Sequence, residues 1–288
     1  MSAAPVSLET RAAEAAARLP ALLTEAERVA GALGAGAHGR RRAGAGETFW
    51  QYRDYDSADA ASLIDWRQSA RAPGRLFVRQ TEWETAASVH LWAGGGDSLD
   101  YGSDGETKRW RAQVAAVALA LLLTRAGERA GPMDGPARGG RLGATALAEH
   151  LLAGPEGGAL PPLPPAGATR LVYVSDFHVP LPTLEPRLAA IAASGRPAHL
   201  LQVSDPAEVS FPFSGRTVFA SPSGTARHET GEAATLAADY AEARAAHLDT
   251  LARLCGRYGW SFTAHVTDAP LTPALAALHA AMSQDRAR

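Results

Sequence analysis

Apolar side chains recur with two different periods along this chain, and the period predicts which segments are helices and which are strands. Between residues 108 and 126, apolar residues fall on almost every side of a helix, so we expect a helix covered on most of its surface. The apolar runs at 89–93, 170–177 and 199–203 are shorter and predict buried strands of a parallel sheet. Further strands are predicted at residues 76–83, 129–133 and 261–266, and further helices at 144–152, 184–194, 233–258 and 272–282.

Two segments depart from this alternation. Residues 7–33 carry apolar positions near helical spacing but contain Pro20, which predicts two short helices packed on the body of the protein. Residues 211–221 surround the pair Ser214-Gly215, which predicts a β-hairpin that turns at this pair.

The order of the elements predicts the fold class. Strands and helices alternate from residue 89 onward with short connections, which is typical of an α/β protein with a doubly wound, mostly parallel (Rossmann-like) sheet. Ligands of such sheets collect outside the carboxyl ends of the strands. We therefore expect any chemistry in two neighbouring loops, residues 94–101 and 175–178.

Composition narrows the classes of protein that fit. The 288 residues are 46% hydrophobic and 20% charged, and the formal net charge of -2 gives no global field that would attract nucleic acid or an acidic membrane. Lys108 is the only lysine, and the single Cys255 excludes an internal disulfide and a zinc site with two cysteines. The most apolar run, residues 114–123, is half of the roughly 20 residues that span a bilayer, and residues 1–23 lack the apolar core of a signal peptide. We expect a cytoplasmic protein without a membrane span.

One loop motif suggests an enzyme. The run from Gly96 to Leu99 follows a strand and spells the Gly-Asp-Ser-Leu block of a group of serine esterases, so a hydrolase using Ser98 is one alternative. That chemistry also needs a base, and the sequence contains no Asp-x-x-His arrangement to supply one. The three glycines before Asp97 complete no phosphate-binding motif.

A second alternative comes from residues 38–84, where arginines, tryptophans and carboxylates are unusually dense. Exposed aromatic rings and the basic run Arg40 to Arg42 would suit a single-stranded nucleic acid. The carboxylates of the same stretch nearly balance its arginines, however, and internal pairs of arginine and carboxylate around packed rings explain the same composition. We therefore favour the internal pairs as the interpretation and keep nucleic-acid binding only as an alternative.

The same stretch resembles a known family. Its blocks resemble the bacterial domain-of-unknown-function family 58 in order and spacing, and Lys108 and residues 174–177 extend the resemblance over most of the chain. The residues that carry the resemblance in the stretch, which we interpret as architectural, are Gly46, Glu47, Arg53, Tyr55, Asp59, Asp65, Trp66, Ser69 and Arg71.

The resemblance implies a domain organisation and a kind of site. It implies an N-terminal helical segment at 1–36, a family-specific Arg/Trp-rich β module at 37–86 and a von Willebrand factor A-like domain at 87–284. Such domains often hold Mg²⁺ in a metal-ion-dependent adhesion site whose first loop reads Asp-x-Ser-x-Ser, because Mg²⁺ takes about six oxygen ligands.

This chain departs from the family's metal-site pattern. If Ser98 is the last serine, Gly94 and Gly96 stand where the aspartate and the middle serine belong. Asp176 matches the later aspartate, and Ser98 and Asp176 are the only weak candidates for metal ligands. We expect a metal-free, degenerate adhesion site without a cofactor, and Mg²⁺ binding is the alternative. The face of this site would be formed by Gly94, Gly96, Asp97, Ser98, Asp100, Thr145 and Asp176.

The resemblance also implies partners. Members of the family are similar to partners of MoxR-type AAA+ ATPases, which are thought to assist the maturation or assembly of other proteins. Since the sequence shows no catalytic constellation, the prediction is a non-enzymatic adaptor that acts with such an ATPase on an unknown client protein.

Overall fold

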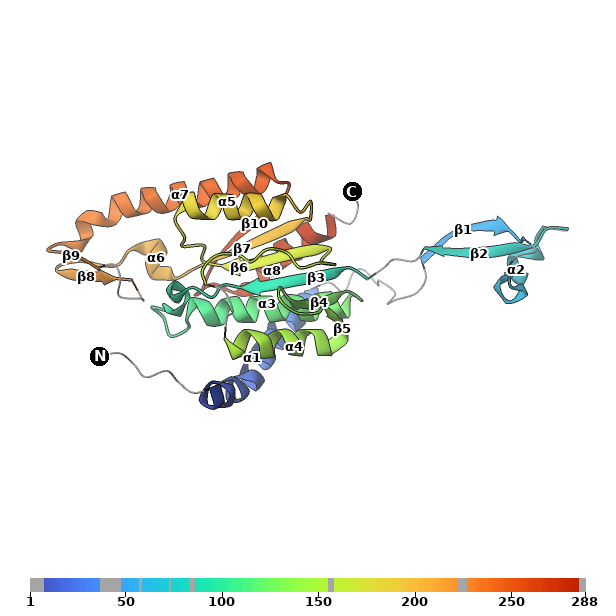
Figure 1. Ribbon diagram of the computed structural model, residues 1–288, viewed down its shortest axis with the longest axis horizontal. Coiled ribbons are helices and arrows are strands. Elements are labelled where there is room, and N and C mark those ends of the chain that lie inside the picture. The colour runs from blue at the N-terminus through green and yellow to red at the C-terminus, as the bar shows by residue number, and fades with distance from the viewer. Residues whose placement is uncertain are drawn as a thin grey trace. The chain divides into compact units, whose positions relative to one another are not determined.

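The computed structural model describes residues 8–36, 48–56, 59–72, 74–82, 86–154, 158–221 and 227–284, and its contacts divide the chain into two compact units. One unit contains the N-terminal helix and the chain from Ala87 onward, and the other spans Arg41–Ala86. Figure 1 shows both. Each unit is described by itself.

The smaller unit is built on an antiparallel pair of strands, β1 (Thr48–Asp54) and β2 (Phe77–Glu82). A 3₁₀ turn, η1 (Ala61–Leu63), and one turn of helix, α2 (Trp66–Ser69), connect them. Asp65 begins α2 because its carboxylate accepts hydrogen bonds from the backbone amides of residues 67 and 68. Ile64 and Val78 supply the buried apolar side chains of this small core.

The larger unit is organised around a six-stranded sheet, in the order β10-β7-β6-β3-β4-β5. All neighbouring strands are parallel except β4 and β5. The strands are β3 (Ser88–Ala93), β4 (Arg129–Pro132), β5 (Arg138–Gly139), β6 (Arg170–Ser175), β7 (Ala198–Ser204) and β10 (Ser261–Val266). The predicted mixed α/β fold with a mostly parallel sheet is therefore confirmed.

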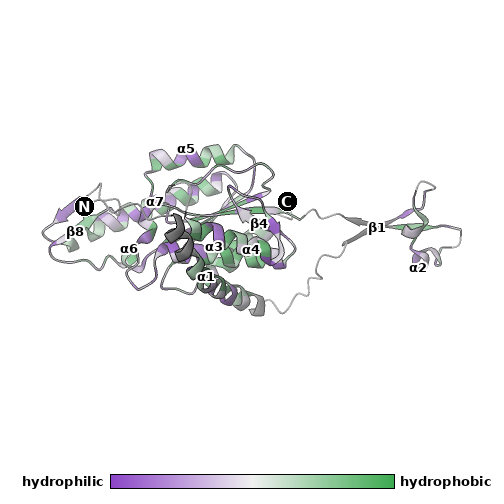
Figure 2. Cartoon of the chain, turned by 60° about the horizontal axis from the view of Figure 1, so that its bottom comes forward, coloured by the Kyte–Doolittle hydropathy of each residue, from purple (hydrophilic) through white to green (hydrophobic). Residues whose placement is uncertain are grey.

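Helices cover both faces of this sheet, and each face has its own apolar core (Figure 1). One face packs against α1 (Leu8–Gly36), α3 (Lys108–Arg125), α4 (Gly140–Ala153) and α8 (Leu271–Gln284). The other packs against α5 (Leu181–Ala192) and α7 (Ala237–Arg257). As expected from its nearly all-round apolar sequence, α3 is buried along most of its length, with α1 and α4 packed against it (Figure 2).

The prediction of two helices separated at Pro20 is wrong. A single helix, α1, runs from Leu8 to Gly36 with Pro20 inside it. Proline removes one backbone donor from a helix, but Ala16 and Pro20 both lie on an exposed side, so water can bind the carbonyl that loses its partner. Further along, Leu22, Ala26 and Val29 are buried on one face, and their packing holds the helix together.

The predicted hairpin at 211–221 is also corrected. The paired strands are β8 (Thr217–Ala220) and β9 (Arg227–Thr230), so only the second half of the predicted segment is a strand. Gly215, in the left-handed conformation with a φ of 66°, turns the chain ahead of β8 instead of between the two strands. Its amide donates to the Glu232 carboxylate at 2.7 Å.

His265 on β10 should make stability fall in mild acid. Burial, assisted by the nearby charge of Arg111, lowers the pKa of His265 to about 4. The unfolded chain, with a histidine pKa near 6.5, then binds more protons between pH 6.5 and 4, so this contribution to stability is complete above pH 6.5 and is lost as the pH falls toward 4. We expect urea unfolding of His265→Gln to lose about 2–3 kcal/mol of this pH dependence, and the exposed His228→Gln to keep it. Equal pH profiles for wild type and His265→Gln would contradict this assignment.

Candidate binding site at the carboxyl edge of the sheet

The two loops predicted to carry the site lie side by side. Strands β3 and β6 are neighbours in the sheet, and the amide of Gly94, just after β3, donates to the carbonyl of Val174 at 2.8 Å. The loop that begins at Gly94 continues as the 3₁₀ turn η2 (Asp97–Asp100), and the loop after β6 starts with Asp176.

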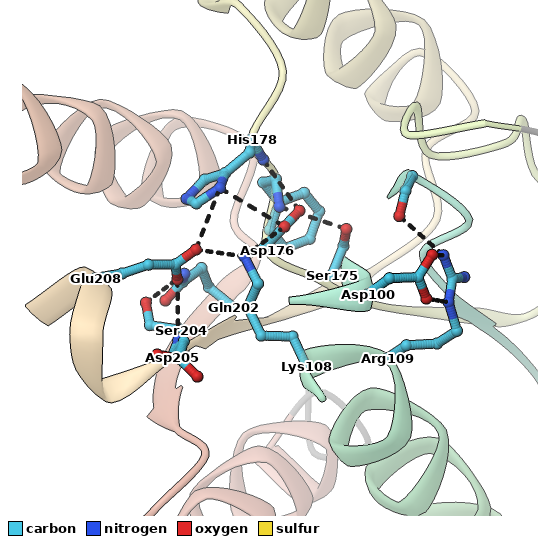
Figure 3. Close-up of polar contacts among 12 residues, drawn as sticks. Asp100, Lys108, Arg109, Ser175, Asp176, His178, Gln202, Ser204, Asp205 and Glu208 are labelled. Carbon is cyan, nitrogen blue, oxygen red and sulfur yellow. Dashed lines mark hydrogen bonds and ion pairs between the residues drawn. The ribbon is translucent and has the colours of Figure 1, made fainter. Parts of the chain in front are cut away.

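A buried ion cluster occupies this edge (Figure 3). Lys108, the first residue of α3, is fully buried, although a lysine at a helix start normally extends into water. Its ammonium donates to Asp176 Oδ2 at 2.9 Å and also to Glu208 Oε1. The side chains of Asp176 and Glu208 are only 3% and 13% exposed, so the three charges lie in a region of low dielectric constant where each depends on the others.

Glu208 is positioned by its own short helix. It belongs to α6 (Pro206–Ser210), which follows β7, and Asp205 and Glu208 form a reciprocal capping box at the start of that helix. The Asp205 amide donates to Glu208 Oε2 at 2.9 Å, which leaves Oε1 free to accept from the lysine. Asp205 is itself fully buried and accepts a hydrogen bond from the amide of Ser103 at 2.8 Å.

Asp176 is held in its charged form. Burial by itself would raise the pKa of this carboxyl, but the charge of Lys108 acts in the opposite direction, and His178 adds to it only when the imidazole is protonated. Hydrogen bonds from Ser98 and from Lys108 add to this effect, so the pKa of Asp176 lies below its usual value. The hydroxyl of Ser98 thus bonds to the carboxylate of Asp176 across the two neighbouring loops.

His178 completes the cluster on its open side. Its Nδ1 lies 3.6 Å from Asp176 Oδ2 and 3.7 Å from Glu208 Oε1, which is too far for strong hydrogen bonds. Desolvation, together with the Lys108 ammonium, outweighs the two carboxylates and lowers the pKa of His178 below 6.5. The imidazole is therefore neutral at pH 7, and the net charge of the cluster is negative.

Two phenylalanines at this edge have backbone conformations that bulky residues rarely adopt. Phe177, between Asp176 and His178, has a φ of 52°, and Phe211, just after α6, has a φ of 45°. Phe177 is fully buried, and its carbonyl accepts a hydrogen bond from His247 Nε2 at 3.0 Å. Strained backbone of this kind clusters at binding and catalytic sites, where the surrounding packing holds it in place.

The glycine loop is closed by packing where the family's pattern has oxygen ligands. A Cβ at Gly94 would collide with the hydroxyl of Ser175 and lie 2.8 Å from Leu99 Cδ1, and one at Gly96 would lie 2.8 Å from Ala159 Cβ. The guanidinium of Arg109 donates to the carbonyl of Gly96 at 3.0 Å and pairs with Asp100.

These residues do not fit a magnesium site. The two glycines supply no side-chain oxygen, and the carboxylate of Asp176 is bound to an ammonium at the position where it would face a metal. Within the described ranges, no group of three or more His, Cys, Asp or Glu residues has the arrangement of a metal site.

Magnesium should therefore leave the stability of the protein unchanged. We expect the melting temperature to be the same with about 10 mM Mg²⁺ as with sodium chloride of equal ionic strength. A native-state site filled at 100 times its dissociation constant would instead add about 2.7 kcal/mol. A rise in melting temperature that is specific to Mg²⁺ would contradict this reading of the site.

The structure brings some of the predicted face together and leaves the rest apart. Ser98 and Asp176 share a hydrogen bond, and Asp100 pairs with Arg109. Asp97 is exposed and has no contact with the lysine. Thr145 lies in the first half of α4. This helix starts after β5, at the amino ends of the parallel strands, so Thr145 is not part of this site.

Three residues that complete the site were not predicted from the sequence as site residues. Lys108 enters the sequence analysis as the only lysine and as part of the family resemblance, His178 only as the last residue of the loop 175–178, and Glu208 not at all. The one available signal was that Lys108 is the chain's only lysine and stands at the start of its most apolar helix.

The predicted architectural residues of the smaller unit fall into three groups: residues with internal contacts, residues outside the described ranges, and the exposed Trp66 and Arg71. The guanidinium of Arg53 holds both carboxylate oxygens of Asp59, at 2.6 and 2.5 Å, and lowers the pKa of that carboxyl to about 2. Tyr55 and Asp65 also make internal hydrogen bonds, and the hydroxyl of Ser69 accepts from the Phe77 amide and donates to the Asp65 carbonyl. Gly46, Glu47 and the run Arg40 to Arg42 lie outside the described residues.

The architectural role predicted for Trp66 is not supported by its position. Its side chain is 64% exposed at the start of α2, and Arg71 is exposed as well. A large ring need not be buried by its own unit when a short helix leaves only one face to pack. Trp66 is therefore a surface residue of the smaller unit, and its replacement is not expected to unfold that unit.

Fold and site together define a class of protein: a Rossmann-like α/β domain that carries a buried lysine and carboxylate cluster at the edge where such sheets bind ligands. The chain belongs to the family described as "Protein of unknown function DUF58", whose family model matches residues 51–250. No curated protein and no solved structure matched the chain. Among the described residues, none of the helices has the length and apolar character needed to cross a membrane.

Proposed function

We propose that this protein is a non-enzymatic adaptor whose larger unit is a von Willebrand factor A-like domain with a degenerate metal-ion-dependent adhesion site. It acts in the cytoplasm with a MoxR-type AAA+ ATPase on a client protein. Membership of the DUF58 family supports the proposed relationship to von Willebrand factor A-like domains and to partners of MoxR-type ATPases. The observation that carries the proposal is Lys108, whose ammonium binds Asp176 and Glu208 at the ligand-binding edge.

The ammonium of Lys108 changes which groups of a partner the edge can bind. A divalent ion with an open coordination position would bind an oxygen ligand from a partner directly. The lysine instead uses its charge on two internal carboxylates, so the edge is fixed in shape without a metal. A fixed, partly apolar surface of this kind suits recognition of a protein segment.

The geometry at Ser98 does not support the hydrolase alternative. A serine nucleophile needs a base within hydrogen-bond reach, and that base is oriented in turn by an acid. Here the hydroxyl of Ser98 bonds to the acid, Asp176, and in the described part of the chain no hydrogen bond joins it to His178, whose Nδ1 lies 3.6 Å from Asp176 Oδ2. We expect a fluorophosphonate probe to label Ser98→Ala and wild type equally weakly. Labelling that disappears in Ser98→Ala would establish the hydrolase instead.

Affinity capture with matched surface variants tests the adaptor. Val218, 43% exposed on β8, lies at the proposed binding edge, and Leu142, 73% exposed on α4, lies near the opposite edge. We expect wild type and Leu142→Asp to capture an AAA+ ATPase from the native host, identified by mass spectrometry, and Val218→Asp to capture much less. The proposal fails when wild type enriches no such ATPase, or when both variants lose it equally.

A further inference from the structure

A cavity of about 760 Å³ opens next to the ion cluster. It lies between η2, α6, the β8–β9 hairpin and the start of α7, all within the larger unit. Lys108, Glu208 and His178 form its polar floor, and the hairpin and α7 form its walls. This volume is in the range of sites that enclose a small ligand or one or two side chains of a partner.

The walls of the cavity are aromatic. The rings of Phe211 and Phe219 stack with centroids 5.8 Å apart, and Phe213 meets Phe211 edge to face at 5.2 Å. Tyr240 on α7 packs against Phe211 at 5.0 Å. All four rings are only partly buried and all four line the cavity, so the cluster gives the cavity an accessible aromatic surface instead of forming a closed core. The left-handed backbone of Phe211 helps to fix this arrangement.

The charges around these rings are predominantly negative. Lys108, the only lysine or arginine among the described residues that line the cavity, is already bound to Asp176 and Glu208. Asp239 is exposed at the rim, and no hydrogen bond or ion pair in the described part of the chain engages it. Arg244, five residues further along α7, donates to Ser204 at 2.9 Å and does not line the cavity.

The pKa values of the two tyrosines that line the cavity are raised, in part by this negative charge. Burial, followed by the charge of Glu208, raises the pKa of Tyr240, and Arg244 opposes the shift without cancelling it. Burial, followed by the charges of Asp205 and Glu208, raises the pKa of Tyr101 in the same way. Burial is the larger cause of both shifts, and the carboxylates add to it, so both phenols lie where a further negative charge is disfavoured.

We propose that this cavity binds the side chain of an arginine presented by a partner protein. A planar guanidinium stacks on aromatic faces and pairs with carboxylates, and its aliphatic stem suits the remaining apolar wall. Asp239 at the rim and Glu208 at the floor face the positive charge. The inference rests on the proposed adaptor function and names the chemistry that the same edge recognises.

An isosteric pair of probes tests the charge preference. N-acetyl-arginine amide and N-acetyl-citrulline amide have nearly the same shape, but only the first is charged at pH 7. In titrations followed by the NMR resonances of the Tyr101 and Tyr240 rings, we expect the arginine probe to bind with a dissociation constant in the millimolar range, about −4 kcal/mol, and the citrulline probe at least about fivefold more weakly. Equal binding of both probes, or no arginine binding up to about 10 mM, overturns the proposal.

Variants of α7 locate the binding. Asp239→Asn should weaken the arginine probe about fivefold and leave the citrulline probe unchanged, because it removes one exposed charge. Asp249→Asn, an exposed carboxylate on the same helix that does not line the cavity, is the matched control and should change neither. An unchanged arginine affinity in Asp239→Asn, or an equal loss in Asp249→Asn, contradicts the assigned place.

The two proposals can fail separately. Capture of an AAA+ ATPase by wild type, without arginine selectivity in the probe titration, would leave the adaptor and remove the arginine site. Arginine selectivity that Asp239→Asn abolishes, without any captured ATPase, would do the reverse.

Discussion

Replacing Lys108 by methionine should lower the free energy of unfolding by about 3–5 kcal/mol, the largest effect expected of any single substitution at this site. Methionine has a similar length, so the loss comes from leaving Asp176 and Glu208 as uncompensated charges in a buried position. Urea unfolding followed by circular dichroism measures it. At low pH the loss should shrink, because protonated carboxyls no longer need the ammonium.

Two further variants test the cause of that loss. Lys108→Met combined with Asp176→Asn and Glu208→Gln should recover most of the stability, since the polar but neutral cluster leaves no buried charge unpaired. Arg141→Met removes a cation from an exposed pair with Glu27, where the arginine is 72% exposed, and should cost less than about 1 kcal/mol. A loss in Lys108→Met no larger than in Arg141→Met would show that the ion cluster contributes little to folding.

Gly94→Ala should be the second most damaging change at this edge, with a loss of about 1–3 kcal/mol. The new methyl group would collide with the hydroxyl of Ser175 and lie too close to Leu99, and both of these residues are buried, so neighbouring packing has to shift with them. The matched control is Gly231→Ala, because a Cβ there meets nothing within 4 Å and its φ lies outside the left-handed region. The denaturant midpoints of the two variants measure this difference, and we expect the lower midpoint for Gly94→Ala. Equal stabilities would mean that the loop after β3 is looser than its packing indicates.

The larger unit could be predicted from the sequence because its strands are short apolar runs and its helices have regular apolar stripes. Those patterns reflect burial on a sheet, which is the force that arranges them. The predictions of a helix break at Pro20 and of a hairpin that turns at Ser214-Gly215 were wrong, each for a different reason. Tertiary packing keeps α1 helical on both sides of Pro20. Gly215 forms a turn before β8 and not between β8 and β9.

The site could be predicted only in part. Ser98 and Asp176 were expected at one edge because each follows a parallel strand, and that expectation needs only the topology. The contact between Lys108 and Glu208 joins residues 100 positions apart, and no periodicity in the sequence reports it. Hydropathy also assigns every lysine to the surface, so a lysine in the interior becomes visible only when the fold brings two carboxylates to it.

The burial of Lys108 has a practical consequence for work with this protein. Because the chain contains one lysine and its side chain is only 1% exposed, the native state offers no side-chain amine to solvent. Amine-directed crosslinkers and coupling resins will therefore miss the edge where partners are expected, and carboxylate-directed or photoactivated reagents are the appropriate choice. The same property makes slow acylation of Lys108 a direct reporter of how often the interior opens.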